Sequence, residues 1–318
     1  QVDQEVLERL ARVGLVVGLV GKEPGALVVA RECAQAWGVA DSDGAACVAS
    51  LRDLMGMTSA FERHSIDHLS ASSINLFVAQ PAMWALQKLM GRKTGVGAAA
   101  HRGTAVEAGV EMGLFDPTLS LEACQEAALA RFNQLTALSA DPNVEKERAG
   151  IASAVAIALG ELRQYGIPGS ADGTRQHRIE VELPGVPVPF IGWLDFWYPD
   201  HGIIIDLKTQ GRLSSKISDP HARQGAIYHA AHGNNEIRFA YVTPQKIGVY
   251  RLEDPRTHIA RVVSIARSIE RFLSLSDDGA ELTAALSPDL DSFYWNDPGS
   301  RAAAEEIWGL APEAMPQA

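Results

Sequence analysis

Residues 192–209 read GWLDFWYPDHGIIIDLKT, two apolar, strand-like runs separated by a short polar segment. That segment, Pro-Asp-His-Gly at 199–202, has residue types that are common in hairpin turns. With Tyr198 and Ile203 flanking the turn, the two runs pair as antiparallel strands. The stretch therefore predicts a β-hairpin that covers roughly residues 188–209.

This pairing gathers charged side chains on one face of the hairpin. Asp195 falls directly opposite Asp206, and Lys208 lies two residues further along on the same face. Directly opposed residues have Cβ atoms about 4.5–5.5 Å apart, so two like charges there destabilise the pairing. The other face is apolar and predicts a core contact through Leu194, Phe196, Ile203, Ile205 and Leu207.

The residues alone leave two interpretations of the acidic pair open. The carboxylates could lie on a solvated strand face, with Lys208 balancing their charge. Alternatively, they share a hard divalent cation such as Mg²⁺, which takes oxygen ligands. A cation would remove their repulsion and activate a water molecule. The lysine would then orient that water or stabilise charge on a phosphate.

The order Asp195, turn, Asp206-Leu207-Lys208 resembles the signature of the PD-(D/E)XK nuclease superfamily, in which an acid precedes a (D/E)-x-K triplet. The ending DLKT is similar to the D-Y-K-T of the RecB-like and phage-exonuclease branch. A D-x-K triplet alone is common by chance, but the resemblance extends over about residues 66–275. It implies an α/β fold with a restriction-endonuclease-like core, a small central mixed β-sheet flanked by helices.

A second motif lies before the predicted sheet, where residues 103–107 read GTAVE. It is similar to the G-x-x-x-H or G-x-x-x-E helix motif of the branch, whose last residue is a further metal ligand. That position is Glu107 here, in the phage-like wording HRGTAVE. Glu111 follows at i+4 and would support the site, and His101 and Arg102 are candidates for phosphate contact. Without the resemblance, Glu107 would be an ordinary exposed helix glutamate.

A third motif follows the lysine strand. Gln224 and Tyr228 match the Q-x-x-x-Y motif of the branch, and their i,i+4 spacing places both on one helix face. From there they could reach the site or DNA, although a helix with one buried tyrosine is the plain alternative. The histidines of this helix do not predict zinc, because no matching partner motif accompanies them. The stretch 70–89 resembles the opening helix of the branch, which helps to shape the DNA entry side.

The resemblance implies a role for each of these residues. Asp195, Asp206 and Glu107 would hold one or two Mg²⁺ ions, with Mn²⁺ as an alternative, and the carbonyl of Leu207 would add a ligand. Lys208 would position a water that displaces the 3′ oxygen in line and leaves a 5′-phosphate. The motif wording favours an exonuclease acting on double-stranded DNA ends in phage-type recombination or repair. The alternatives are a RecB-like or CRISPR-type nuclease module and a catalytically silent DNA-binding protein of the same fold.

The charge of the chain is unevenly distributed. A formal net charge of −11 over 318 residues argues against a general nucleic-acid coat. Two segments, 68–106 and 207–218, contain no acid and would contact DNA phosphates, so sequence selectivity should be low. Their basic residues are Lys88, Arg92, Lys93, Arg102, Lys208, Arg212 and Lys216.

Cysteine spacing and hydropathy limit the cofactors and the compartment. Cys33, Cys47 and Cys124 form no C-x-x-C pair, so the iron–sulfur cluster of CRISPR-associated relatives is not carried over. No apolar run approaches the length of a membrane span, and the N-terminus lacks the basic start of a secretory signal. We therefore expect a cytoplasmic protein of a bacterial or phage-infected cell. The resemblance implies DNA as its partner, a single-strand annealing protein as a natural second partner, and an oligomeric state that stays open.

The chain divides into three predicted segments. Residues 1–56, rich in Ala, Val and Gly, predict a helical appendage, residues 57–298 the nuclease domain, and residues 299–318 a peripheral tail. Periodicity and turn signals predict helices at 70–89 (interrupted by Pro81), 104–112, 119–138, 147–165, 219–233 and 257–275, and strands at 179–183, 188–209, 237–243 and 246–252.

Overall fold

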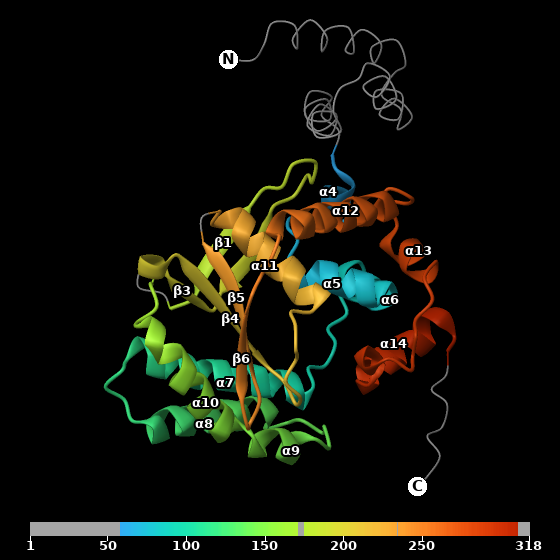
Figure 1. Cartoon of the computed structure of the whole chain (residues 1–318). Coiled ribbons are helices and arrows are strands. Elements are labelled where there is room, and N and C mark those ends of the chain that lie inside the picture. The colour runs from blue at the N-terminus through green and yellow to red at the C-terminus, as the bar shows by residue number, and fades with distance from the viewer. Residues whose placement is uncertain (1–57, 171–174, 234, 311–318) are drawn as a thin grey trace, which may run out of the picture.

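The computed structural model describes residues 58–170, 175–233 and 235–310. They form a four-stranded β-sheet with helices on both of its faces, as Figure 1 shows. The predicted α/β class, with a small central mixed sheet flanked by helices, is therefore confirmed. The helical appendage predicted for residues 1–56 lies outside the described residues.

The central sheet has the strand order β3-β4-β5-β6. β3 (Phe196–Tyr198) and β4 (Ile203–Thr209) pair antiparallel, β4 and β5 (Glu236–Val242) pair parallel, and β5 and β6 (Ile247–Arg251) pair antiparallel. A parallel neighbour needs a crossover connection, which contains α11 (Asp219–Ala231). β4 is thus an inner strand with a neighbour on each edge.

The turn of the predicted hairpin is confirmed. Tyr198 pairs with Ile203, around a short 3-10 segment, η2 (Pro199–His201). Gly202 completes the turn with a φ of 62°, a left-handed conformation that glycine adopts without the steric cost a Cβ would add. The local sequence therefore sets the register of β3 against β4.

The predicted single hairpin is wrong on one point, because its first strand breaks at Asp195. β2 (Phe190–Leu194) ends before this residue and pairs with β1 (His177–Val181) in a separate two-stranded ribbon, and β3 begins after it. The bend interrupts the alternation of side chains. Leu194 therefore packs in the core on one side of the sheet, whereas Phe196 packs on the other side.

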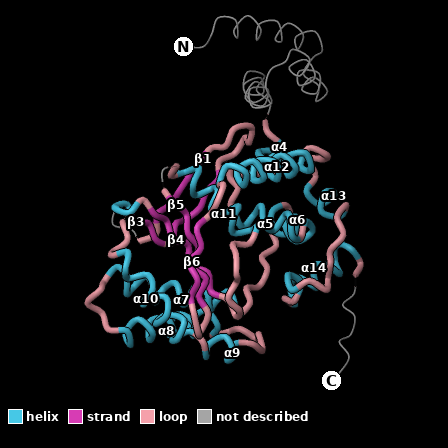
Figure 2. Tube along the Cα trace, in the orientation of Figure 1, coloured by secondary structure: helices cyan, strands magenta, loops and turns pink. Residues whose placement is uncertain are grey.

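Hydrophobic clusters cover both faces of β4. Ile205 packs into one cluster and its neighbour Ile204 into the other, and both side chains are 0% exposed. Figure 2 shows the strands lying between the two sets of helices. The first cluster includes residues of α7 (Ala98–Phe115), α8 (Leu121–Thr136) and α10 (Ile151–Leu162), and the second includes residues of α5 (Ala71–Ala79), α11 and α12 (Pro255–Leu273).

Local signals explain where several helices begin. The side chain of Ser70 accepts a hydrogen bond from the Ser73 N–H and caps α5. Pro81 ends the first helical run and begins α6 (Pro81–Lys88), as the sequence predicts. The other described helices and 3-10 turns are α4 (Ala60–Arg63), α9 (Val144–Ala149), η1 (Arg163–Tyr165), α13 (Gly279–Ala284), η3 (Phe293–Trp295) and α14 (Pro298–Trp308).

Two helix starts differ from the prediction. The pair Asp219-Pro220 predicts Asp219 as the N-cap of α11, but the N-cap is Ser218 and Asp219 is the first helical residue. The helix that carries Glu107 begins at Ala98, so Gly103 lies inside α7 rather than before it. A Cβ added to Gly103 would lie 3.4 Å from Oγ1 of Thr209, which shows that α7 passes close to the C-terminal end of β4.

The predicted C-terminal tail begins inside α14. Ala304 on this helix is 0% exposed and belongs to a small hydrophobic cluster with Trp295 and with Met83 of α6. The described part of residues 299–318 is therefore packed against α6, the helix that precedes the loop with Arg92 and Lys93.

Candidate active site

Three acids and a lysine from separate elements interact at one end of β4. Asp206 and Lys208 lie on β4, Asp195 lies at the bend before β3, and Glu107 lies on α7. Asp206 shifts the pKa values of Asp195, Glu107 and Lys208, and the pKa of Lys208 responds to all three acids. The structure therefore brings together the four residues that the sequence predicts to be catalytic.

The side chain of Asp195 is hydrogen-bonded to the backbone of β4. The ladder between β3 and β4 stops at the pair formed by Phe196 and Ile205, so the Leu207 N–H has no backbone acceptor on β3. It donates instead to Oδ2 of Asp195 at 2.8 Å. This hydrogen bond holds the Asp195 carboxylate at Leu207, the residue that follows Asp206. The predicted role of the Leu207 carbonyl as a metal ligand stays a prediction.

Asp206 is fully buried, with 0% of its surface exposed. The solvated-face interpretation is therefore wrong for this residue. Lys208 Nζ lies 2.6 Å from Oδ1 of Asp206. Burying a carboxylate is costly unless it is paired or hydrogen-bonded, and this lysine supplies the pairing charge.

The second oxygen of Asp206 faces the motif on α11. The Tyr228 hydroxyl lies 3.4 Å from Oδ2 of Asp206 and donates its stronger bond, at 2.8 Å, to the carbonyl of Trp193. Gln224 Nε2 donates to the Tyr228 hydroxyl at 2.6 Å. Through these contacts, Gln224 and Tyr228 connect α11 with β2 and β4 beside the buried Asp206.

The electrostatics of the site show an excess of negative charge. Burial, followed by the charges of Asp206 and Glu107, raises the pKa of Asp195 well above its usual range. Burial and then Asp206 likewise raise the pKa of Glu107. Burial alone would lower the pKa of Lys208, but the surrounding carboxylates outweigh it and raise this pKa to about 12. Lys208 therefore stays cationic, and Asp195 and Glu107 resist ionisation.

Two glutamates on α7 form polar contacts with residues of the segment before β1. Gln176 Nε2 donates to Oε1 of Glu107 at 3.1 Å, and Arg175 forms an ion pair with Glu111 at 3.6 Å. The motif search missed Gln176. If the pairing of β1 with β2 is extended by one residue, Gln176 falls opposite Asp195. Only the fold shows that α7 lies against this end of the ribbon.

His221 is a further residue that the functional assignment missed. Its Nδ1 lies 2.7 Å from the hydroxyl of Tyr241, the residue paired with Lys208 across β4 and β5. Burial and then the charge of Lys208 lower the pKa of His221 to about 4. The imidazole is therefore neutral at physiological pH.

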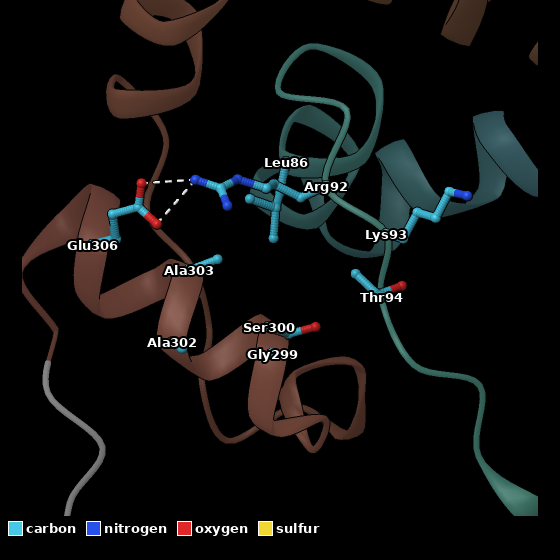
Figure 3. A pocket seen from close by; sticks show the side chains of 9 residues that line it. All are labelled: Leu86, Arg92, Lys93, Thr94, Gly299, Ser300, Ala302, Ala303 and Glu306. Atoms are coloured by element: carbon cyan, nitrogen blue, oxygen red, sulfur yellow. Dashed lines mark hydrogen bonds and ion pairs between the residues drawn. The ribbon is translucent and has the colours of Figure 1, made fainter. Parts of the chain in front are cut away.

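The basic stretch before and within the start of α7 is less free than its sequence suggests. Arg102 forms a largely buried ion pair with Glu147 of α9, so a phosphate contact by Arg102, which stays a prediction, would require this pair to open. Arg92 binds Glu306 of α14 through two hydrogen bonds of 2.7 and 3.0 Å, drawn in Figure 3. His101 lies in the first turn of α7 and is partly buried.

The Arg92–Glu306 bridge borders a cavity of about 240 Å³ between α14 and the loop after α6. None of the four predicted catalytic residues lines it. On the other basic stretch, Arg212 and Lys216 are exposed on the loop that follows β4. The loop that follows β4 therefore carries two exposed basic side chains, close in sequence to Lys208.

The donor set fits a hard divalent cation. Oδ1 of Asp206 is buried and, besides the ion pair with Lys208, has no donor in hydrogen-bond geometry among the described residues. In the described ranges, no group of three or more His, Cys, Asp or Glu side chains is arranged so that it could hold a metal ion by itself. Mg²⁺ does not require one, since it usually takes one or two carboxylates and completes its shell with water and phosphate oxygens. Asp195 and Asp206 can supply that pair, with Glu107 beside them.

A mixed sheet flanked by helices carries a D-x-K strand, a preceding acid and a helix glutamate, the arrangement that the PD-(D/E)XK signature predicts. The model of the PD-(D/E)XK nuclease superfamily matches residues 68–304, and the chain belongs to this superfamily. Its members are usually nucleases and usually use divalent metals such as Mg²⁺.

Other comparisons add little. A search of curated proteins finds no significant match. Among solved structures, the one titled "Crystal structure of SSO0001" is similar at 15% sequence identity, over 59% of this chain and 84% of that chain, with a TM-score of 0.29. A score this low carries no argument. In the described part of the chain, no helix combines the length and apolar character needed to cross a bilayer.

Proposed function

We propose that the protein is a Mg²⁺-dependent deoxyribonuclease, most simply an exonuclease acting on double-stranded DNA ends. The observation that carries the proposal is the buried Asp206, which pairs with Lys208 at 2.6 Å and whose charge raises the pKa values of Asp195 and Glu107. A structural role alone would favour an apolar residue at this inner-strand position, because a buried ion pair contributes little net stability.

Each residue of the site has a distinct task in this proposal. Asp195 and Asp206, with Glu107, would hold the cation, and Leu207 would add its carbonyl. A bound cation offsets the carboxylate charge and polarises water and phosphate. Lys208, kept cationic by the carboxylates, donates a hydrogen bond from Nζ to the attacking water or to a phosphate oxygen.

The proposed reaction is hydrolysis of a phosphodiester. A bond forms between phosphorus and the water oxygen, and the bond between phosphorus and O3′ breaks. One proton of the water is lost to solvent, and O3′ gains a proton. The products are a 3′-hydroxyl and a 5′-phosphate. Arg212 and Lys216, exposed on the loop after β4, would contact backbone phosphates without reading sequence.

The exonuclease assignment rests on the similarity of residues 103–107 and of the DLKT ending to the RecB-like and phage-exonuclease branch. It makes DNA the partner and phage-type recombination or repair the context. A single-strand annealing protein and a cytoplasmic location belong to the same proposal. Fold does not fix function, so an endonuclease and a silent DNA-binding protein are the competing outcomes.

The test uses linear and closed circular duplex DNA, with Mg²⁺ or with chelator. We expect the wild type to degrade only linear DNA and only with Mg²⁺, and Lys208→Ala to lose at least 100-fold in rate, as for loss of one charged donor. Lys146→Ala, an exposed lysine of α9, is the matched control and should cleave normally. Nicked circles would indicate an endonuclease. Binding without cleavage in every condition would refute the enzyme proposal.

A further inference from the structure

Trp193 exposes a large aromatic surface next to the acids. The residue is 50% exposed, whereas the other tryptophans that the structure describes are buried or partly buried. It lies two residues before Asp195 on an extended segment, a separation of about 7 Å. Aromatic side chains usually gain stability by burial, so an exposed indole at this place needs an explanation.

The pairing of β1 with β2 shows which way this indole points. Gly192 pairs with Ile179, and a Cβ added to Gly192 would lie 3.4 Å from both Ile179 and Tyr228, so this face of the ribbon packs on the core. Neighbouring residues alternate between the two faces. Trp193 and its partner Arg178 therefore lie on the opposite, open face.

That open face continues into the candidate active site. Gln176, in the bend just before β1, lies two residues from Arg178 and donates its amide to Glu107 at 3.1 Å, which connects this end of the ribbon to the acids. Asp195, two residues after Trp193, contributes to the same cluster of acids. The indole and the guanidinium thus lie on the ribbon two residues from Asp195 and Gln176, at the end that meets the acids.

The backbone beneath the indole is held in place. The carbonyl of Trp193 accepts the 2.8 Å hydrogen bond from Tyr228, whose hydroxyl also lies 3.4 Å from Asp206. Arg178 is 50% exposed, and its guanidinium forms a 2.7 Å ion pair with Glu180, itself 49% exposed. An exposed ion pair of this kind exchanges readily for a phosphate contact, because its net contribution to stability is small.

We propose that Trp193 and Arg178 form a subsite for an unpaired nucleotide of the DNA substrate, beside the cleavage site. The indole stacks on the base, and the guanidinium contacts the adjoining phosphate. Bases inside a duplex are already stacked on both faces, so only a terminal or unpaired base can use the indole. The inference rests on the proposed nuclease function and deepens it, since the favoured substrate is a strand end with unpaired nucleotides.

The first test measures binding of a fluorescently labelled short oligo-dT to the full chain in chelator, where no cleavage should occur. We expect Trp193→Ala to weaken binding roughly 5- to 150-fold, the range of base–aromatic stacking, and Trp193→Phe to retain most of it. Arg178→Gln should lower the salt dependence by about one phosphate contact. The matched control is Phe293→Ala, an exposed aromatic of η3 that should bind like the wild type.

The second test separates this inference from the nuclease proposal. On a duplex with a single-stranded overhang and Mg²⁺, Trp193→Ala should raise KM with little change in kcat. Loss of oligo-dT binding by Trp193→Ala in a protein that never cleaves DNA supports the subsite while refuting the nuclease. Wild-type oligo-dT binding by a folded Trp193→Ala protein refutes the subsite, whether or not the enzyme cleaves.

Discussion

A divalent cation should stabilise this protein against heat, and the size of the effect follows from the charges around Asp206. Three carboxylates and one ammonium leave a charge of −2 when all are ionised. Two like charges about 5 Å apart repel by about 3 kcal/mol at an effective dielectric constant near 20. Without a metal the site therefore carries a local electrostatic cost, and a bound cation would remove it.

The measurable gain depends on the occupancy of the site. At a Mg²⁺ concentration about ten times the Kd, linkage gives about 1.4 kcal/mol. For a domain of this size, that corresponds to an increase in Tm of roughly 3–6 °C. The measurement is thermal unfolding by calorimetry or fluorescence, in chelator and then with Mg²⁺ or Mn²⁺ at millimolar concentrations.

The increase in Tm should also depend on pH. Asp195 and Glu107 have raised pKa values in the folded state, so the folded protein without metal binds more protons than the unfolded chain. Their contribution to stability is present below the unfolded pKa, near 4, and is lost as pH rises through the folded pKa. The Mg²⁺ effect should therefore be larger at pH 8 than at pH 5.5.

Two variants decide whether the effect belongs to this site. Asp206→Asn should abolish the response of Tm to Mg²⁺, because it removes the central carboxylate. Asp200→Asn changes an exposed aspartate in the turn before β4 and should respond like the wild type. An unchanged wild-type Tm at millimolar Mg²⁺, or an equal increase in Asp206→Asn, would refute the metal-site reasoning.

Three further outcomes test the surroundings of the site. Tyr228→Phe leaves the Trp193 carbonyl without its donor and should cost about 1–3 kcal/mol in urea unfolding; no loss would mean that water replaces the hydroxyl. His221, with its pKa lowered to about 4, should make stability fall as pH decreases from about 6.5 to 4, by on the order of 2 kcal/mol after allowance for its exposure. His221→Gln should remove that part of the pH dependence, and an unchanged profile would contradict the assignment. A double-mutant cycle of Arg92→Ala and Glu306→Ala should give a coupling below about 1 kcal/mol, because both side chains are about half exposed; a larger value would show that this bridge holds α14 in place.

Local features of the sequence determined much of the fold. The turn at 199–202, the glycine with positive φ and the cap at Ser70 act between residues close in the chain, and so they are readable from the sequence. The same holds for Asp206 and Lys208, because side chains two residues apart on a strand share a face. Glu107 was assigned to the site only through the family resemblance. Helix periodicity does not indicate that it lies near Asp206, which is 99 positions further along the chain.

The tertiary structure decided the environment of those residues. Asp206 is buried because β4 is an inner strand covered by helices on both faces, which no local pattern can show. The break at Asp195 reverses the face of Leu194, because β2 leaves the sheet to pair with β1.

The sequence by itself determined the acid–acid–lysine set and the class of protein to which it belongs. The fold decided how many basic side chains remain free to contact DNA. Arg92 and Arg102 look free in a stretch without acids, yet Glu306 and Glu147, distant in sequence, pair with them in the structure. Electrostatic interaction depends on distance in space and on burial, and both are fixed only when the chain has folded.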